Sequence, residues 1–261
     1  MNFFRFLPVV LAAGLLSGCC SSQIAAPEAE VPGMVIRKIT APIKLDGKPD
    51  EKDWQNAPAY SLVYNSEVTG WGPKARERVY ADKFEKSWVK VLYDDKYLYV
   101  AGFLEDNDIM SFAQADQDLL YQNADTFEFF MWPEDGMHYW EIYATPDGFK
   151  TSLFYPSGGM AQYKGKLGDG VLMKGLEVVS QINGSLNVHS DHDQNWTTEI
   201  RIPLSELEAK GVKFSPDKRW RFLAGRYNYA HRLFKRQVSC FPEQPAHNFH
   251  MRMYYAPVLF K

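Results

Sequence analysis

The feature that most constrains the fold is a succession of short β-prone segments separated by turn residues. The segments "WVKVLY" (88–93) and "YLYVAGFLED" (97–106) flank the turn "DDK", a pattern that predicts a β-hairpin with the second segment as a central strand. Asn183-Gly184 joins "GLEVVSQI" to "SLNVHS", and this dipeptide also predicts a hairpin. "WTTEIRI" (196–202) alternates with period two, as a strand with one buried face does.

One helix is expected. "PLSELEAKG" (203–211) begins with Pro and ends with Gly, which are start and stop signals of a short helix. Many strands without a long helix indicate an all-β chain. The prediction is an antiparallel β-sandwich of the jelly-roll or immunoglobulin-like kind over residues 34–261.

The first 33 residues have a different character. An apolar run ends in "LSGC" (16–19), and it is too short for a permanent transmembrane helix, so residues 1–18 are predicted to be a signal peptide. The four residues resemble the lipobox of bacterial lipoproteins, which implies that Cys19 becomes the lipidated N-terminus. Residues 19–33 have the composition of a tether. The expected location is the bacterial cell envelope, at the outer membrane or the cell surface, with the lipid as the membrane contact.

Charge and cysteine content narrow the function classes. The chain has 29 Lys and Arg against 32 Asp and Glu, and without a basic stripe it is not expected to bind nucleic acid. Cys240 is the cysteine outside the anchor region, so no disulfide framework is expected and its thiol should be buried. A late hairpin carries the basic residues Arg226, His231, Arg232, Lys235 and Arg236. We expect it to be an exposed tip, with contact to an acidic sugar as the alternative. A single polar-surfaced domain is expected to be a monomer.

Common catalytic motifs are missing from the sequence. There is no Gly-x-Ser-x-Gly elbow, no phosphate-binding Gly loop and no His-Glu-x-x-His helix. "HSDHD" (189–193) can be a metal site or a polar loop, and no metal is predicted there. No cofactor is otherwise expected.

"NADTFEFFMW" (123–132) is the segment with the strongest functional signal. In a strand, Glu128 shares a face with Phe130 and Trp132, while Asp125 lies on the other face. Glu128 could be a catalytic acid, a sugar-binding group or a surface charge. A glycosidase would need a second carboxylate opposite it. Asp125, Glu141 and Asp147 are candidates, but no local pattern pairs any of them with Glu128.

A sugar site needs aromatic residues as well as polar groups such as Glu128, because sugar rings stack on aromatic faces while their hydroxyls bind polar groups. Several rings lie in or beside predicted loops: Trp71, Tyr121, Trp132, Trp140, Tyr155, Tyr163 and Phe241.

Five motifs in order resemble family 9 carbohydrate-binding modules and the related DOMON-type domains. They are "IKLDGKPDEKDWQNAP" (43–58), "VKVLYDDKYLYVAGFLEDND" (89–108), "NADTFEFF" (123–130), "WTTEIRIPLSEL" (196–207) and "HNFHMRMYYAPVLF" (247–260). The resemblance implies a β-sandwich that clamps a sugar of an oligosaccharide or polysaccharide between two rings and does not cleave it.

The resemblance also assigns residues. Asp125 and Glu128 match the family's D-x-x-E pattern, and the clamp rings fall on Tyr121 and Phe241, where the family has tryptophans. With Trp140 added from the ring set, these are the predicted ligand-binding residues, and no residue is predicted to be catalytic. Members of the family can also bind calcium, so the resemblance allows a structural calcium ion, although no oxygen-ligand loop in the sequence requires one.

Three alternatives remain open at the sequence level. The first is a glycan hydrolase that uses Glu128 with a second carboxylate. The second is a haem carrier of the DOMON-related kind, with ligands among Met110, Met131, His138 and Met160. The third is a structural envelope lipoprotein whose sugar site has decayed.

Overall fold

The computed structural model describes residues 31–64, 84–158, 162–163, 166–167, 170–231, 236–245 and 248–261. The predicted signal peptide, Cys19 and most of the predicted tether lie outside these residues. Within them the chain is all-β, as predicted. The predicted helix is α3 (Leu204–Ala209), and a second, unpredicted helix, α1 (Lys52–Asn56), is a single turn in the loop before Tyr60.

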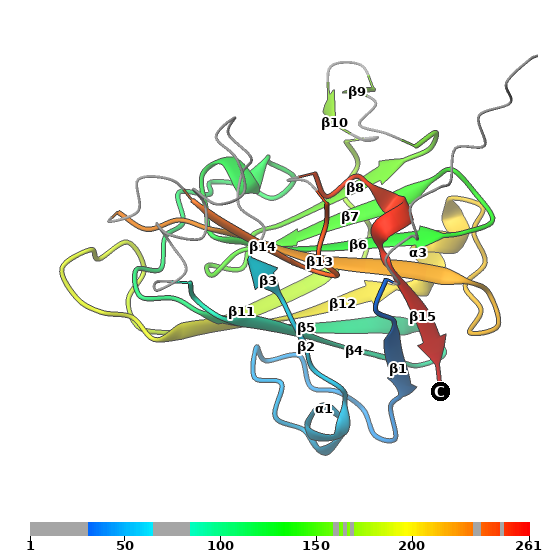
Figure 1. Ribbon diagram of the computed structural model, residues 1–261, viewed down its shortest axis with the longest axis horizontal. Helices are drawn as coiled ribbons and strands as arrows, with labels where there is room; N and C mark the ends of the chain where they lie inside the picture. The colour runs from blue at the N-terminus through cyan, green and yellow to red at the C-terminus, as the bar shows by residue number, and fades with distance from the viewer. Residues whose placement is uncertain are drawn as a thin grey trace, which may run out of the picture. The chain divides into compact units, whose positions relative to one another are not determined.

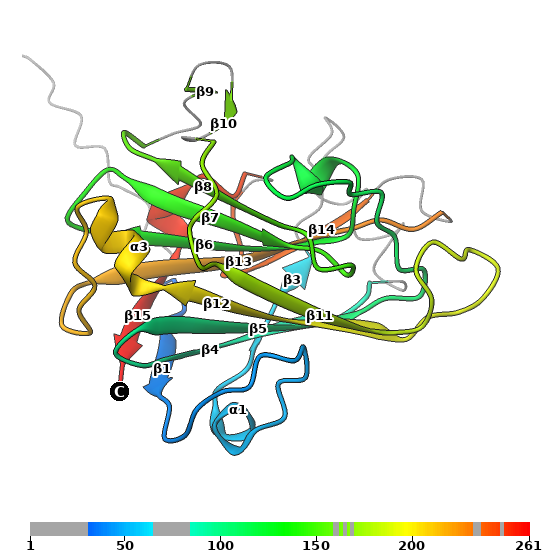
Figure 2. The ribbon, with the colours of Figure 1, turned by 180° about the vertical axis from the view of Figure 1, so that it is seen from behind.

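The strands form a 13-stranded sheet with two halves (Figures 1 and 2). The first half has the order β11 (Glu177–Asn183), β12 (Asn195–Pro203), β5 (Tyr97–Glu105), β4 (Ser87–Tyr93) and β1 (Met34–Lys38). The second half continues with β15 (Ala256–Phe260), β13 (Trp220–Asn228), β6 (Thr126–Pro133), β7 (Tyr139–Ala144) and β8 (Lys150–Tyr155). The shorter strands at the sides are β2 (Tyr60–Ser61), β3 (Val63–Tyr64) and β14 (Gln237–Phe241), and β9 (Gln162–Tyr163) and β10 (Lys166–Leu167) form a separate pair.

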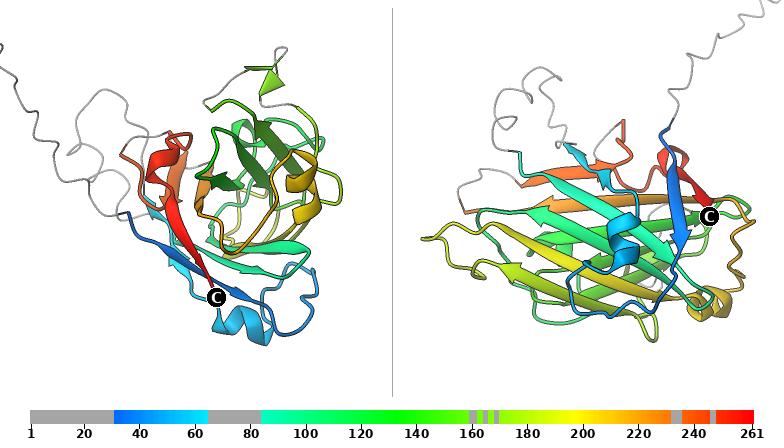
Figure 3. Two further views of the ribbon diagram at one scale, coloured as in Figure 1. Left: turned by 90° about the vertical axis from the view of Figure 1, so that its right-hand side faces the viewer. Right: turned by 90° about the horizontal axis from the view of Figure 1, so that it is seen from below.

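Strand β1 joins the two halves. It pairs in parallel with β15, Met34 opposite Val258, and in parallel with β4, Arg37 opposite Leu92. The other pairings of the described strands are antiparallel. The two halves therefore belong to one continuous sheet that folds over on itself, and they lie face to face (Figure 3).

The main hydrophobic core lies between these halves. Alternate residues of β4 and β5, such as Val91 and Val100, meet alternate residues of β6 and β7, such as Phe129 and Ile142. The strand alternation read from the sequence produces this pattern, because every second side chain points inward. Strand β5 lies between β12 and β4, which confirms the predicted central strand.

A second apolar cluster covers the opposite face of the second half. It includes Leu120, Phe130, Tyr139, Tyr143, Leu153, Tyr155, Leu223, Val238, Cys240, Phe249 and Tyr255. Strands β6, β7 and β13 thus have side chains packed on both faces. The Cys240 thiol is buried here, as predicted.

The hairpin predicted at Asn183-Gly184 is wrong. Strand β11 ends at Asn183, but "SLNVHS" forms no strand, and β11 pairs with β12 across the loop 184–194. The Asp193 carboxylate accepts hydrogen bonds from the backbone N–H groups of Ser185 and Ile109, both at 2.7 Å. These bonds hold the segment after Gly184 in a loop. The hairpin prediction missed them because it rests on the Asn183-Gly184 dipeptide alone.

Among the residues that the structure describes, no helix combines the length and the apolarity that crossing a bilayer requires.

Candidate functional site

Two buried glutamates lie on the face of the second half that carries the second cluster. Glu128 of β6 is opposite Tyr143 of β7 on one side and Gly225 of β13 on the other. Glu141 of β7 shares this face, because it is two residues from Tyr143. Glu128 is 2% exposed and Glu141 is 3% exposed. The sheet register therefore brings a second carboxylate next to Glu128 that no sequence pattern had paired with it.

Glu141 is held by two tyrosines. The hydroxyl of Tyr143 donates to Oε1 at 2.6 Å, and the hydroxyl of Tyr155 donates to Oε2 at 2.7 Å. Burial, followed by the Glu141 charge, raises the pKa of both hydroxyls above the ordinary tyrosine value. The two tyrosines therefore keep their protons and act as donors.

Glu128 is different, because no described residue makes a hydrogen bond to its carboxyl group. Burial raises the pKa of Glu128 well above its ordinary value, and the charge of Glu141 adds to this effect. The positive charge of Arg236 opposes it only in part. The surroundings favour a neutral carboxyl group at Glu128, which can both donate and accept a hydrogen bond.

Aromatic rings border Glu128. Tyr121, in the 3-10 helix η2 (Leu120–Gln122), has its ring 6.0 Å from that of Tyr143 and 5.3 Å from that of Tyr227. The Arg236 guanidinium lies over the Tyr227 ring at 4.6 Å. Tyr121 is half-buried, so part of its ring is accessible beside this set.

Phe249 completes the border on the β13 side. Its ring lies 5.7 Å from that of Tyr227 and is so close to Gly225 that a Cβ at this glycine would be 2.5 Å from the ring. Because Gly225 is opposite Glu128 in the sheet, Phe249 lies beside Glu128 and helps to bury it.

The structure brings together two of the five predicted ligand-binding residues, Tyr121 and Glu128. Asp125 is fully buried, and both of its oxygens accept backbone hydrogen bonds, from Met110 and from Tyr229, each at 2.6 Å. Asp125 thus connects the loop before η2 to the end of β13.

The other two predicted residues face the opposite side of the sheet. Trp140 belongs to the main core and is 1% exposed. Phe241 packs against the same core, with its ring 5.0 Å from that of Tyr60. Strand alternation explains both positions: Cys240 points to the Glu128 face, so its neighbour Phe241 points away.

Phe249 is the ring that the sequence reasoning missed. It belongs to "HNFH", shortly before the closing strand, where the second clamp ring was expected. Phe241 and Phe249 both satisfy this loose spacing, and only the sheet register shows which of them lies beside Glu128.

The remaining candidates are dispersed. Trp71, Met160 and the side chain of Tyr163 lie outside the described residues, and Met131 lies in the main core. In the predicted polar loop, the His189 ring binds the Asp108 carboxylate at 2.8 Å. The described part of the chain has no group of three or more His, Cys, Asp or Glu side chains arranged to hold a metal ion.

Comparisons with known proteins identify the fold. No family model matches the chain, and no curated protein matches it. A candidate carbohydrate-binding protein from Bacteroides uniformis superposes with a TM-score of 0.62 at 13% identity, over 88% of this chain and 99% of that one.

Two structures of a family 9 carbohydrate-binding module from Caldicellulosiruptor kristjanssonii also match, each at 14% identity over 87% of this chain. The complex with glucose has a TM-score of 0.55 and is covered over 95% of its length. The complex with cellotriose has a TM-score of 0.52 and is covered over 93%. The chain therefore has the fold of family 9 carbohydrate-binding modules.

Proposed function

We propose that this protein binds carbohydrate without cleaving it, at the face of β6, β7 and β13 that carries Glu128. The observation that carries the proposal is the Glu128 carboxyl group, which is buried beside aromatic rings and has no hydrogen-bond partner among the described residues. A buried polar group without a partner costs about 1–3 kcal/mol. A sugar hydroxyl would supply the missing partner, and the fold shared with sugar-binding modules supports this assignment.

The neighbours of Glu128 suit a sugar ligand. The accessible part of the Tyr121 ring can stack on the C–H face of a pyranose. The Arg236 guanidinium and a neutral Glu128 can donate to sugar hydroxyls. Because Phe249 is 3% exposed and lies across Gly225, its ring must shift for a ligand to contact Glu128.

Calorimetric titration of the purified protein with mono- and oligosaccharides tests the proposal. Glu128→Ala and Tyr121→Ala should each weaken binding about tenfold or more, since each removes a direct contact. Phe103→Ala is the control, because this half-buried ring belongs to β5 in the first half of the sheet and not to the strands of the Glu128 face. Absence of binding to every sugar, or equal affinities of all variants, would refute the proposed function.

One observation favours a second candidate, a glycan hydrolase. Glu128 and Glu141 lie on neighbouring strands of one face, and the environment of Glu128 favours its protonated form, as in the general acid of a glycosidase. Turnover of an oligosaccharide that is lost in both Glu128→Gln and Glu141→Gln would support hydrolysis. Binding without turnover would leave the non-catalytic function.

We further propose that the protein is a monomer held at the cell envelope by lipid on Cys19. The proposal is supported by "LSGC" and by the tether-like residues that follow it. Mass spectrometry of the protein from bacterial membranes should find acyl chains on Cys19. In Cys19→Ser the protein should leave the membrane fraction, and an unchanged membrane fraction would contradict the anchor.

A further inference from the structure

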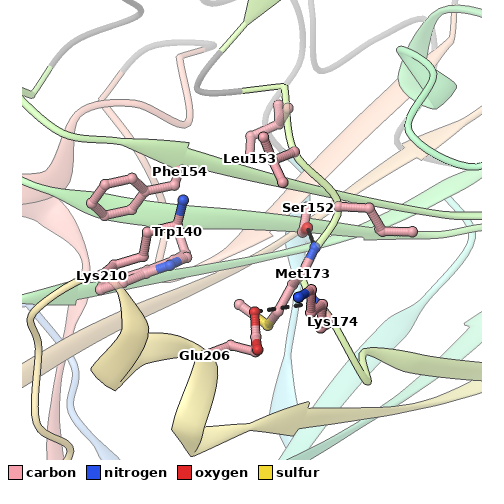
Figure 4. Close-up of a pocket in the computed structure, with 10 residues that line it drawn as sticks. Trp140, Ser152, Leu153, Phe154, Met173, Lys174, Glu206 and Lys210 are labelled. Atoms are coloured by element: carbon pink, nitrogen blue, oxygen red, sulfur yellow. Dashed lines mark hydrogen bonds between the residues drawn. The ribbon is translucent and has the colours of Figure 1, made fainter.

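A small cavity lies on the other side of the β7–β8 sheet from Glu141. It is about 90 Å³ in volume and lies between β7, β8, residues 171–174 and α3 (Figure 4). Phe154, Leu172 and Met173 contribute apolar side chains to its wall. Nothing in the proposed function uses this cavity, although it contains Trp140, one of the rings singled out from the sequence.

The segment at the cavity rim is fixed by two hydrogen bonds. The Met173 N–H donates to Ser152 Oγ at 2.7 Å, and the Lys174 N–H donates to Glu206 Oε2 at 3.1 Å. Figure 4 shows both bonds next to the cavity. The wall is thus held in place by its own polar contacts, as expected of a preformed ligand site.

Two polar atoms of the wall, the Trp140 Nε1 and the Glu206 Oε1, have no hydrogen-bond partner among the described residues. Trp140 is 1% exposed, and its indole N–H makes no hydrogen bond. At the rim, the Oε1 atom of Glu206 accepts no hydrogen bond either. Beside the two lysines that also line it, Lys174 and Lys210, the cavity therefore offers the Trp140 donor, the Glu206 acceptor and an apolar lining.

We propose that this cavity binds the acetamido group of an N-acetylated sugar, a site separate from the Glu128 face. The carbonyl oxygen of the group accepts from the Trp140 indole, and its N–H donates to Glu206. Its methyl group packs against the apolar wall. The cavity has the volume of about three water molecules in the liquid, which suits a group of four non-hydrogen atoms. The inference rests on the proposed function, since it assumes a carbohydrate ligand.

The test compares N-acetylglucosamine, glucosamine and glucose by calorimetric titration of the whole protein. N-acetylglucosamine should bind about tenfold or more tightly than the other two sugars, because only it satisfies both groups of the cavity. Trp140→Phe and Glu206→Gln should each remove this advantage, and glutamine keeps one acceptor oxygen for the Lys174 N–H. Glu206 is half-buried on the surface of α3, so its variant keeps the test decisive even if Trp140→Phe lowers the melting temperature.

Trp220→Phe is the matched control. Trp220 is also 1% exposed with an unpartnered indole N–H, but it does not line the cavity, so its variant should keep the acetamido advantage. Sugar binding that depends on Glu128 but shows no preference for the N-acetyl group would overturn this inference and leave the proposed function standing. Loss of the preference in Glu128→Ala but not in Trp140→Phe would also overturn it, and no binding of any sugar would overturn both proposals.

Discussion

At the scale of single residues, Glu128 combines features that a merely structural glutamate avoids. It is buried, it lies close to a second carboxylate, and it has no hydrogen-bond partner among the described residues. Glu141, in contrast, has two tyrosine donors. On this face, both carboxyl oxygens of Glu141 accept hydrogen bonds from the protein, whereas the carboxyl group of Glu128 can form hydrogen bonds with a ligand.

This difference predicts a pH-dependent effect of Glu128→Gln. The pKa of Glu128 is raised above 4.5 in the folded protein, so its contribution to stability is fully present below the unfolded pKa and is lost as the pH rises through the folded pKa. Glutamine keeps the shape without the charge. The variant should exceed the wild type in free energy of unfolding at pH 8 by about 1–3 kcal/mol and match it near pH 4.

Urea denaturation at both pH values measures this difference. Glu208→Gln, at an exposed position of α3, is the control and should show no pH-dependent change. An equal difference between Glu128→Gln and the wild type at pH 4 and pH 8 would contradict the assigned cause.

At the scale of elements, β13 packs against the segment before β15, where the Phe249 ring lies over Gly225. A Cβ at position 225 would be 2.5 Å from the Phe249 ring, so Gly225→Ala should displace the ring and lower the free energy of unfolding by about 1–3 kcal/mol. In a Phe249→Ala background the same substitution should cost clearly less. A double-mutant cycle by denaturant unfolding measures the coupling, and additive losses would mean that Phe249 does not lie against Gly225 in solution.

Element boundaries were predictable where local pattern and tertiary structure agree. The hairpin at residues 88–106 and the α3 helix follow from alternation and from start and stop residues. The failed hairpin at Asn183-Gly184 depends on Asp193, whose carboxylate binds a backbone group 84 residues away in the chain. Such long-range bonds override a turn propensity and leave no local pattern.

The candidate site was predictable only in part, for a related reason. The D-x-x-E pattern located Glu128. Which side chain each neighbouring strand places beside Glu128, however, depends on the strand register. Phe241 and Trp140 are adjacent in sequence to Cys240 and Glu141, which point to the Glu128 face, and a shift of one residue reverses the face. Glu141 was one of several candidate carboxylates that no local pattern paired with Glu128, and Phe249 was missed. Only strand pairing and packing place these two residues next to Glu128.

At the scale of the whole molecule, a buried arginine ties the two halves of the sheet together. Arg226 of β13, expected on an exposed tip, is 1% exposed. Its Nη1 donates to Ser87 Oγ of β4 at 2.9 Å and to the Glu105 carbonyl of β5 at 2.7 Å, and its Nη2 binds Asp106 Oδ2 at 2.9 Å. A single side chain therefore joins β13 to β4, to β5 and to the residue that follows β5.

Removing this link should destabilise the protein most at high pH. Burial raises the pKa of Asp106, and the Arg226 charge opposes that rise. Without the arginine the pKa of Asp106 in the folded protein rises further. The protein therefore goes on losing stability up to a higher pH, because a larger part of the pH range ionises Asp106 only in the unfolded chain. Arg226→Met should lower the free energy of unfolding by about 3–5 kcal/mol at pH 8 and by less at pH 5, because it leaves a buried carboxylate unpaired.

Chemical denaturation of Arg226→Met and of the double variant Arg226→Met/Asp106→Asn at both pH values separates charge from packing. If the unpaired Asp106 charge causes most of the loss, the double variant should recover stability at pH 8. Part of its remaining deficit should still depend on pH, because the Arg226 charge also opposes the rise in pKa of the buried Asp125 carboxyl group. A loss in Arg226→Met that is equal at pH 5 and pH 8 would instead assign the role of Arg226 to its neutral contacts with Ser87 and the Glu105 carbonyl. The two halves would then be joined by hydrogen bonds and packing at this point, with the ion pair contributing little.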